Sequence, residues 1–230
     1  MIELLNHNKC VAIVGAKNAA ANGRSFAHKI ANDLVKEGYI TVSGLAREID
    51  SSVHQDAISQ TIGVIAGGID HIYPPENKKL FENLAEEGLI LAELPIGSTP
   101  PPLGKHFPQR NRIISGLALG VVVVEASLKS GSLITAKFAL EQNREIFAVP
   151  GFPLDPRCQG TNKLIREGAY LVESVDDIVA NLPQYEEFIK KDDGLFKDFV
   201  ELGTVNTRYV KEPSQKEYTA LYWNYYRQYP

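Results

Sequence analysis

The chain has 230 residues, of which 44% are hydrophobic and 23% are charged, and its formal net charge is -4 at pH 7. These values are typical of a globular protein with a packed core. They exclude a protein that coats nucleic acid by bulk positive charge, so any binding of anions must come from a local basic cluster.

The chain shows no sign of export or of a membrane segment. No apolar run approaches the ~20 residues that span a bilayer, and the start "MIELLNHNKC" is too short and too polar for a secretory signal. Neither cysteine has the CxxC spacing of a metal or redox site. We therefore expect a cytoplasmic protein without a membrane partner.

Short β-branched runs alternate with helical patterns through the first four fifths of the chain. Strands are predicted at residues 10–15, 39–44, 63–68, 89–94, 121–126 and 145–151. Helices are predicted at residues 23–38, 50–63, 74–88 and 130–144, and from Pro108 onward, with a last helix, a short strand and a closing helix before residue 182. This order predicts an α/β fold with a doubly wound, mostly parallel sheet and helices on both faces.

The texture of the sequence changes after Pro183. The segment "QYEEFIKKDDGLFKDF" is rich in charge, and the end "YTALYWNYYRQYP" is dense in tyrosine. We divide the chain into a core domain at 1–182 and an appendage at 183–230. The role of the tyrosine-rich end is left open by its composition.

The loops that follow the predicted strands hold the candidate binding residues. In an open parallel sheet the carboxyl ends of the strands share one edge, and ligands bind there. Basic side chains recur in these loops, at Lys17, Arg47, Lys105, Arg110, Arg112 and Lys129. Few carboxylates oppose them, so the sequence predicts one basic edge on an acidic protein.

Two familiar nucleotide motifs are missing from these loops. The first loop, "GAKNAAANG", is neither GxGxxG nor a P-loop, and the second strand ends in Ser43-Gly44 rather than in an acidic residue that would bind a ribose. No nucleophile elbow GxSxG is present. We expect no cofactor, no metal and no catalytic residue.

The stretch "KSGSLITA" at residues 129–136 has two interpretations. Ser130 or Ser132 could cap a helix whose free N–H groups hold a phosphate beside Lys129, or the same residues could form a plain helix start at the surface. The stretch "FPQRNRIISG" at residues 107–116 is equally open. Arg110 and Arg112 could fan out over successive phosphates while Phe107 stacks on a base, or they could be solvated next to a core phenylalanine.

Three other side chains are weaker candidates. Glu93 and Glu125 stand at strand ends and could form an acid–base pair, but we favour a structural role in which they cap loops or pair with Arg110 or Arg112. We expect His54 to lie on a helix surface.

Read together, the loops resemble the DNA-processing protein A family (DprA, also called Smf). The matching segments run in the order "VAIVGAKNAAANG", "TVSGLAREID", "GVIAGGIDHIYPPEN", "GLILAELPIG", "HFPQRNRIISGLALGVVVVEASLKSGSLITAKFALEQNREIFAVPG" and "QGTNKLIREGA". The resemblance implies an extended Rossmann fold without catalytic activity. It also implies a homodimer that binds single-stranded DNA, protects incoming strands and loads the RecA recombinase in natural transformation.

By position, the resemblance also implies which residues bind DNA. They are Gly15, Ala16, Lys17, Gly44, Arg47, Lys105, Phe107, Arg110, Asn111, Arg112, Lys129, Ser130, Gly131 and Ser132. Two of the loops depart from the family pattern. Gly15-Ala16-Lys17 replaces Gly-Ser-Arg, which keeps the charge and loses the guanidinium fork. Glu48 stands where the family has a glycine.

The main alternative is an enzyme. Phosphoribohydrolases of the lysine-decarboxylase-like type share this core and bind nucleoside monophosphates, but they carry a PGGxGTxxE segment. The nearest stretch here, "IAGGIDHIYPPEN", lacks the GTxxE continuation. A third interpretation makes the chain a protein-interaction module that uses its tyrosine-rich end.

Overall fold

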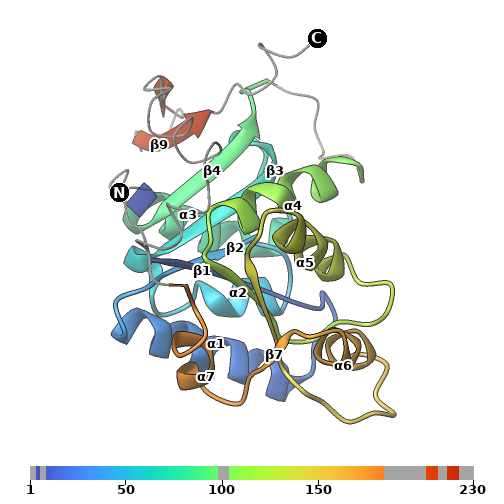
Figure 1. The fold of residues 1–230 in the computed structure, drawn as a ribbon. Coiled ribbons are helices and arrows are strands. Elements are labelled where there is room, and N and C mark those ends of the chain that lie inside the picture. Colours follow the sequence, from blue (N-terminus) through green and yellow to red (C-terminus); the bar gives the residue numbers. More distant parts are fainter. Residues whose placement is uncertain (1–3, 6–8, 98–103, 184–205, 212–216, 223–230) are drawn as a thin grey trace.

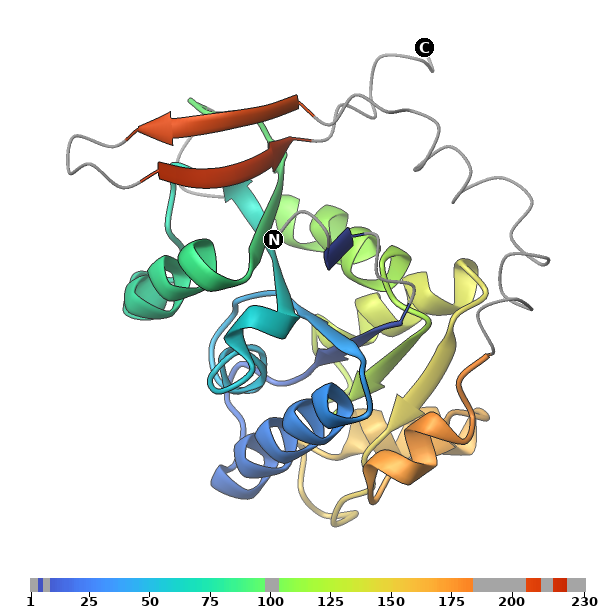
Figure 2. The same cartoon turned by 90° about the vertical axis from the view of Figure 1, so that its left-hand side faces the viewer.

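The computed structural model describes residues 4–5, 9–97, 104–183, 206–211 and 217–222, the last two ranges as backbone only. Its centre is a parallel sheet of β1 (Cys10–Val14), β2 (Ile40–Ser43), β3 (Thr61–Gly68), β4 (Leu89–Leu94), β5 (Gly120–Val123), β6 (Glu145–Ala148) and β7 (Tyr170–Leu171). The strands lie in the order β7-β6-β5-β1-β2-β3-β4, as Figures 1 and 2 show.

Helices connect these strands and cover the sheet. They are α1 (Ala21–Lys36), α2 (Ile49–Val53), α3 (Lys78–Glu87), α4 (His106–Gly116), α5 (Ser132–Glu141), α6 (Gln159–Arg166) and α7 (Val175–Val179), with single turns η2 (Ile58–Gln60) and η3 (Pro75–Asn77). The predicted α/β class, the Rossmann-like winding and the parallel sheet with helices on both faces are confirmed.

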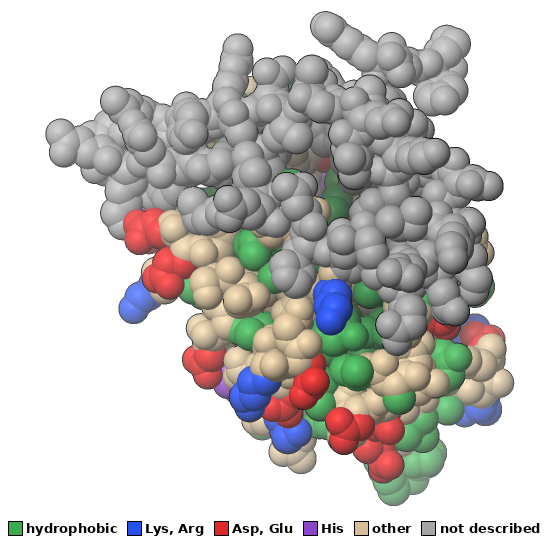
Figure 3. All heavy atoms as spheres, turned by 60° about the vertical axis from the view of Figure 1, so that its left-hand side comes forward, with side chains coloured by type: hydrophobic (Ala, Val, Ile, Leu, Met, Phe, Trp, Pro, Cys, Tyr) green, Lys and Arg blue, Asp and Glu red, His purple; other side chains and the backbone are tan. Residues whose placement is uncertain are grey.

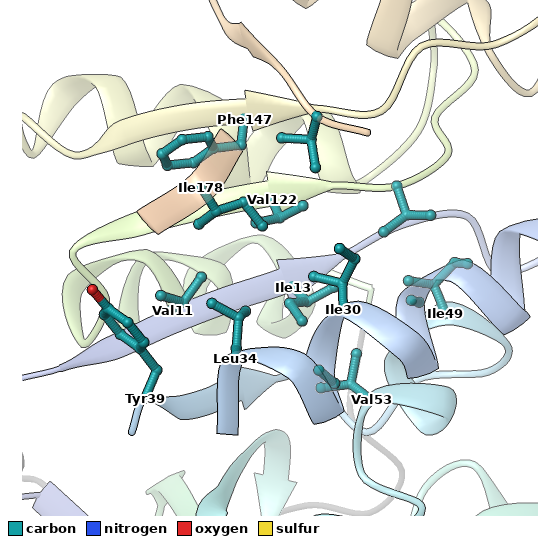
Figure 4. Packing of buried hydrophobic residues seen from close by; sticks show 14 of the residues in the cluster. Val11, Ile13, Ile30, Leu34, Tyr39, Ile49, Val53, Val122, Phe147 and Ile178 are labelled. Atoms are coloured by element: carbon teal, nitrogen blue, oxygen red, sulfur yellow. The ribbon is translucent and has the colours of Figure 1, made fainter. Parts of the chain in front are cut away.

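The core consists of two apolar layers, one on each face of the sheet. Successive residues of a strand point to opposite faces, and β1 shows this directly. Val11 and Ile13 pack with Ile30 and Leu34 of α1, as Figure 4 shows. Ala12 and Val14, together with side chains of α4 and α5, form the second layer. Every residue of β1 is buried, as a strand covered on both faces requires.

The segment predicted as one helix at 50–63 is broken in the structure. Helix α2 ends at Val53, η2 follows, and β3 begins at Thr61. The residue before the helix, Glu48, has φ 64 and no side-chain cap, and Asp50 lies in the first turn without capping it. The carboxylate of Asp50 instead accepts a hydrogen bond from the backbone N–H of Ala46 at 3.4 Å.

The prediction for His54 is also wrong, because the side chain is fully buried. Its Nδ1 lies 2.8 Å from Oγ1 of Thr61, and that hydroxyl is 2.8 Å from Oγ1 of Thr41. This polar chain ties α2 to β2 and β3. The helical periodicity of the sequence did not predict this burial, because the helix that would have exposed His54 ends one residue before it.

Beyond residue 183 the structure describes only two strands. The backbone of β9 (Glu217–Tyr222) pairs parallel with β4, and β8 (Asn206–Lys211) pairs antiparallel with β9, as Figure 2 shows. The remainder of the predicted appendage lies outside the described residues, and the boundary at 182 stays a prediction. Within the described residues no helix is long and apolar enough to cross a membrane.

Candidate nucleic-acid interface

A pocket lies at the carboxyl ends of β1, β2 and β3, where the start of α4 meets the sheet. Twelve residues line it: Lys17, Gly44, Ala46, Arg47, Ile65, Ala66, Gly67, His71, Tyr73, Pro74, Phe107 and Arg110. The chain therefore brings together five of the predicted residues, from two loops and helix α4: Lys17, Gly44, Arg47, Phe107 and Arg110. Within the described part of the chain, three basic side chains and no carboxylate line this pocket.

One side of the pocket is built from rings and an ammonium group. The Nζ of Lys17 lies 4.6 Å from the centroid of the Phe107 ring, and the rings of Phe107 and Tyr73 are 5.6 Å apart and tilted by 55°. Desolvation lowers the pKa of Lys17, an effect that Asp50 opposes and that Arg110 and Arg47 reinforce. A cation beside an aromatic face is suited to a base and its phosphate.

The floor of the pocket is the buried guanidinium of Arg110, with the carboxylate of Asp50 buried near it. The Arg110 side chain is buried, and its Nη1 donates to the carbonyl of Val64 at 2.6 Å. Burial lowers the pKa of Arg110, while Asp50 raises it. Burial raises the pKa of Asp50, while Arg110 lowers it. A Cβ on Gly44 would collide with both side chains, so this glycine makes room for the pair.

Arg47 forms the exposed edge of the pocket. Its Nε donates to the carboxylate of Glu76, and both side chains are about half exposed. The loop that carries Arg47 is held from outside, because the amide of Asn77 donates to the carbonyls of Leu45 and Ala46 at 3.0 and 3.2 Å. The backbone position of Arg47 is therefore fixed, while its guanidinium head stays at the surface.

Neither interpretation left open for Arg110 and Arg112, a fan over phosphates or a solvated helix start, describes the structure. Arg110 turns inward to the floor, and Arg112 pairs with the carboxylate of Glu93 at the end of β4. The structural role favoured for Glu93 is thereby confirmed. Asn111, between the two, donates to the carbonyl of Gly131 at 3.2 Å. Successive residues of a helix point in different directions, and here each direction has its own partner.

The remaining predicted residues do not line the pocket. Gly15 lies against Ile49 of α2, where a Cβ would not fit, and Ala16 packs on the core. The hydroxyls of Ser130 and Ser132 are 2.7 Å apart. Lys105 and Lys129 are exposed. These side chains lie at the same edge of the sheet as the pocket, without forming one continuous site with it.

Glu125 explains why the pocket is not at the usual place. In folds of this kind a ligand often binds where the strand order reverses, here between β1 and β5. That crevice is occupied by the Glu125 carboxylate, which accepts a hydrogen bond from the N–H of Ala20 at 3.0 Å and leaves no room for a Cβ on Gly23. The structural role favoured for Glu125 is confirmed, and the pocket lies over β1, β2 and β3 instead.

The charge on the neighbouring surface is mixed. On the face drawn in Figure 3, acidic and basic side chains alternate among apolar ones over the described residues. In the described pocket lining, by contrast, lysine and arginine occur without a carboxylate, although the whole chain has a net charge of -4.

The sequence analysis missed one wall of the pocket. That wall is the loop after β3, which contributes His71, Tyr73 and Pro74. The signal was present, because this loop follows a strand and contains an aromatic residue. The prediction rested on basic side chains, and this loop was therefore not included.

Comparisons with known proteins identify the family of the chain. The sequence model for "DNA recombination-mediator protein A" matches residues 1–183. The chain is 46% identical to the DNA processing protein DprA of Bacillus subtilis over 184 residues, which is 79% of this chain and 61% of that protein. It therefore spans about three fifths of that relative.

Two solved structures share the fold. The DprA structure from Streptococcus pneumoniae has a TM-score of 0.73 at 39% identity, covering 80% of this chain and 65% of the other. A DprA from Helicobacter pylori, described in terms of its single-stranded DNA binding mode, has a TM-score of 0.72 at 28% identity, covering 82% and 84%. The chain belongs to the DNA recombination-mediator protein A family, the DprA/Smf proteins, as the order of its loops predicts.

Proposed function

We propose that this chain binds single-stranded DNA without strong sequence preference, through the pocket of Lys17, Arg47, Tyr73 and Phe107. The observation that carries the proposal is the ammonium of Lys17 over the ring of Phe107, which in turn contacts the ring of Tyr73, in a pocket whose described lining holds no carboxylate. Cations bind phosphates of any sequence, and ring faces stack on any base.

The same proposal extends to the role of the protein in the cell. Binding would protect single strands in the cytoplasm and help to load a RecA-type recombinase during DNA uptake or recombination, as the likeness to DprA proteins supports. No catalytic step is part of the proposal. The phosphoribohydrolase alternative is not favoured, because the family match covers residues 1–183.

A homodimer is also part of the proposal. Large exposed apolar side chains within the described residues concentrate in the second half of the core, at Leu128, Ile134, Leu140, Phe152, Leu154, Tyr170 and Leu171. Phe152 and Leu154 are 68% and 80% exposed, and exposed apolar patches of this kind mark interaction sites. A dimer would place two pockets on one strand and raise the overall affinity.

The test is fluorescence anisotropy of labelled oligo-dT at several salt concentrations. Because Arg110 is buried and Arg112 is paired, we expect only about three phosphate contacts and a log–log salt slope of about -2. Lys17→Gln should weaken binding about tenfold for all sequences alike, through the loss of one charge-assisted contact.

Lys137→Gln is the matched control, since Lys137 is an exposed lysine on α5 that pairs with Glu141. An affinity that does not depend on salt, or equal effects of the two substitutions, would refute the proposal. Release of free adenine from AMP would instead support the enzyme.

A further inference from the structure

A second groove lies beside the pocket, between α1 and α2. Polar side chains dominate its lining, among them Arg24, Ser25 and His28 from α1 and Ser51 and Ser52 from α2. The predicted site residues include only one residue of this groove, Arg47. We asked what its chemistry would bind.

Arg47 connects the groove to the pocket, because it lines both. Its guanidinium stands at their common border, with a side chain that is 55% exposed. The two hollows are therefore adjacent at Arg47. The second arginine of the groove, Arg24, is 43% exposed.

Each of the two arginines is held by a carboxylate. Nη1 of Arg24 lies 2.5 Å from Oε2 of Glu48, and Arg47 pairs with Glu76. The groove is therefore close to neutral as it stands, and a phosphate must displace a carboxylate to bind. The displacement costs little, because exposed ion pairs contribute little net stability, while a phosphate can accept two hydrogen bonds from one guanidinium.

The groove differs from the pocket in lacking rings for base stacking. Among the described residues that line it, the only ring is the imidazole of His28, which already lies 3.3 Å from the carbonyl of Ser52 and 2.9 Å from the carboxylate of Asp56. Hydroxyls, amides and guanidinium groups are suited to phosphate and sugar rather than to base faces.

We infer that the groove of Arg24, Arg47, Ser51 and Ser52 binds the sugar–phosphate backbone of the same DNA strand where it leaves the pocket. Glu48 and Glu76 compete with the phosphates for the two arginines and thereby limit affinity. The inference rests on the proposed binding of single-stranded DNA in the pocket, and it adds a second, base-independent section to the path of the strand.

The experiment compares two labelled ligands. One is the shortest oligo-dT with measurable affinity, which tests the pocket. The other is the same oligomer extended at both ends by abasic deoxyribose phosphates, which offer backbone without bases. For the wild-type protein we expect the extension to raise affinity and to steepen the salt slope by about 0.7 for each added contact.

Two substitutions with opposite expected effects on the affinity then test the groove. Arg24→Gln should weaken binding of the extended ligand roughly fivefold and leave the affinity for the short ligand unchanged. The substitution removes one charge-assisted contact to phosphate, and the ion pair that competes with this contact is weak. Glu48→Gln frees Arg24 at constant side-chain size and should raise the affinity for the extended ligand by a similar factor. Misfolding could not produce such a gain.

The outcomes separate the two proposals. If the short ligand does not bind to the wild-type protein, the proposed function fails. If the short ligand binds and the abasic extension adds nothing, or if Arg24→Gln and Glu48→Gln act no differently from Lys137→Gln, the groove is overturned while the pocket stands.

Discussion

At the scale of single residues, the chain shows how one backbone conformation constrains a binding loop. Glu48 has φ 64 and ψ -103, a region that glycine tolerates and other residues enter only at a cost. This accounts for the glycine of the family pattern at this position. The added carboxylate does not line the pocket at the ends of β1, β2 and β3; it lines the neighbouring groove, where it pairs with Arg24.

His54 provides a prediction at the same scale. Burial lowers the pKa of His54 from 6.5 to about 3. Between these two values the unfolded chain binds a proton that the folded protein excludes, so stability falls as the pH decreases from 6.5 and is fully present above it. The expected slope from this residue is at most about 1.4 kcal/mol per pH unit.

Urea unfolding of wild type and His54→Gln at pH 7.5, 5.5 and 4.5 measures this contribution. Glutamine retains a polar group near Thr61 and does not titrate, so the difference in unfolding free energy between the two proteins should narrow as the pH falls. If the unfolding free energies of His54→Gln and wild type change in parallel with pH, the lowered pKa of His54 is contradicted.

At the scale of elements, α4 organises the pocket by sending side chains in different directions. Arg110 reaches β3, Arg112 reaches Glu93 of β4, and Asn111 reaches the loop before α5. Of these side chains only Arg110 and Phe107 line the pocket, Arg110 at its floor and Phe107 beside Lys17. The polar contacts fix the position of the helix, and the position of the helix fixes the ring.

The buried pair under this helix predicts strong coupling. Arg110→Met leaves Asp50 buried without its cation, and we expect a loss of about 3–5 kcal/mol in the free energy of unfolding. The double variant with Arg110→Met and Asp50→Asn should lose much less unfolding free energy than the sum of the two single losses, because no charge then stays buried alone.

A double-mutant cycle by urea unfolding measures the coupling. Arg112→Met is the comparison variant, since its side chain is 25% exposed, and we expect it to cost less than Arg110→Met. Additive effects of the Arg110 and Asp50 substitutions would show that the two groups do not interact.

At the scale of the whole molecule, the proposed dimer makes a measurable prediction. Phe152 and Leu154 occupy the loop after β6, far along the chain from the pocket residues, and are the most exposed large apolar side chains described. The double substitution Phe152→Ser and Leu154→Ser should shift the mass in light scattering from dimer toward monomer.

The same variant should keep its affinity for a short oligo-dT and lose affinity for a long one, because only a long strand spans two pockets. The single-site ligand serves as the control for folding. An unchanged mass would place the dimer elsewhere or exclude it.

The sequence by itself determined the order of strands and helices. It did so because alternation of buried strands with amphipathic helices is a local pattern, visible in windows such as residues 10–15 and 23–38. Where the local signal was ambiguous, as in residues 50–63, the prediction of a single helix was wrong. There α2 ends at Val53, and His54 is buried against Thr61 at the start of β3.

The sequence also located the edge of the sheet at which basic residues gather, since the carboxyl ends of parallel strands meet there by topology. Only the tertiary structure decided which of those residues are accessible. Arg110 and Arg112 are equally basic in the sequence, but Asp50 and Glu93 lie far away along the chain and approach them only after folding. Burial and the pairing of charges depend on distance in space, which residue types and their spacing do not encode.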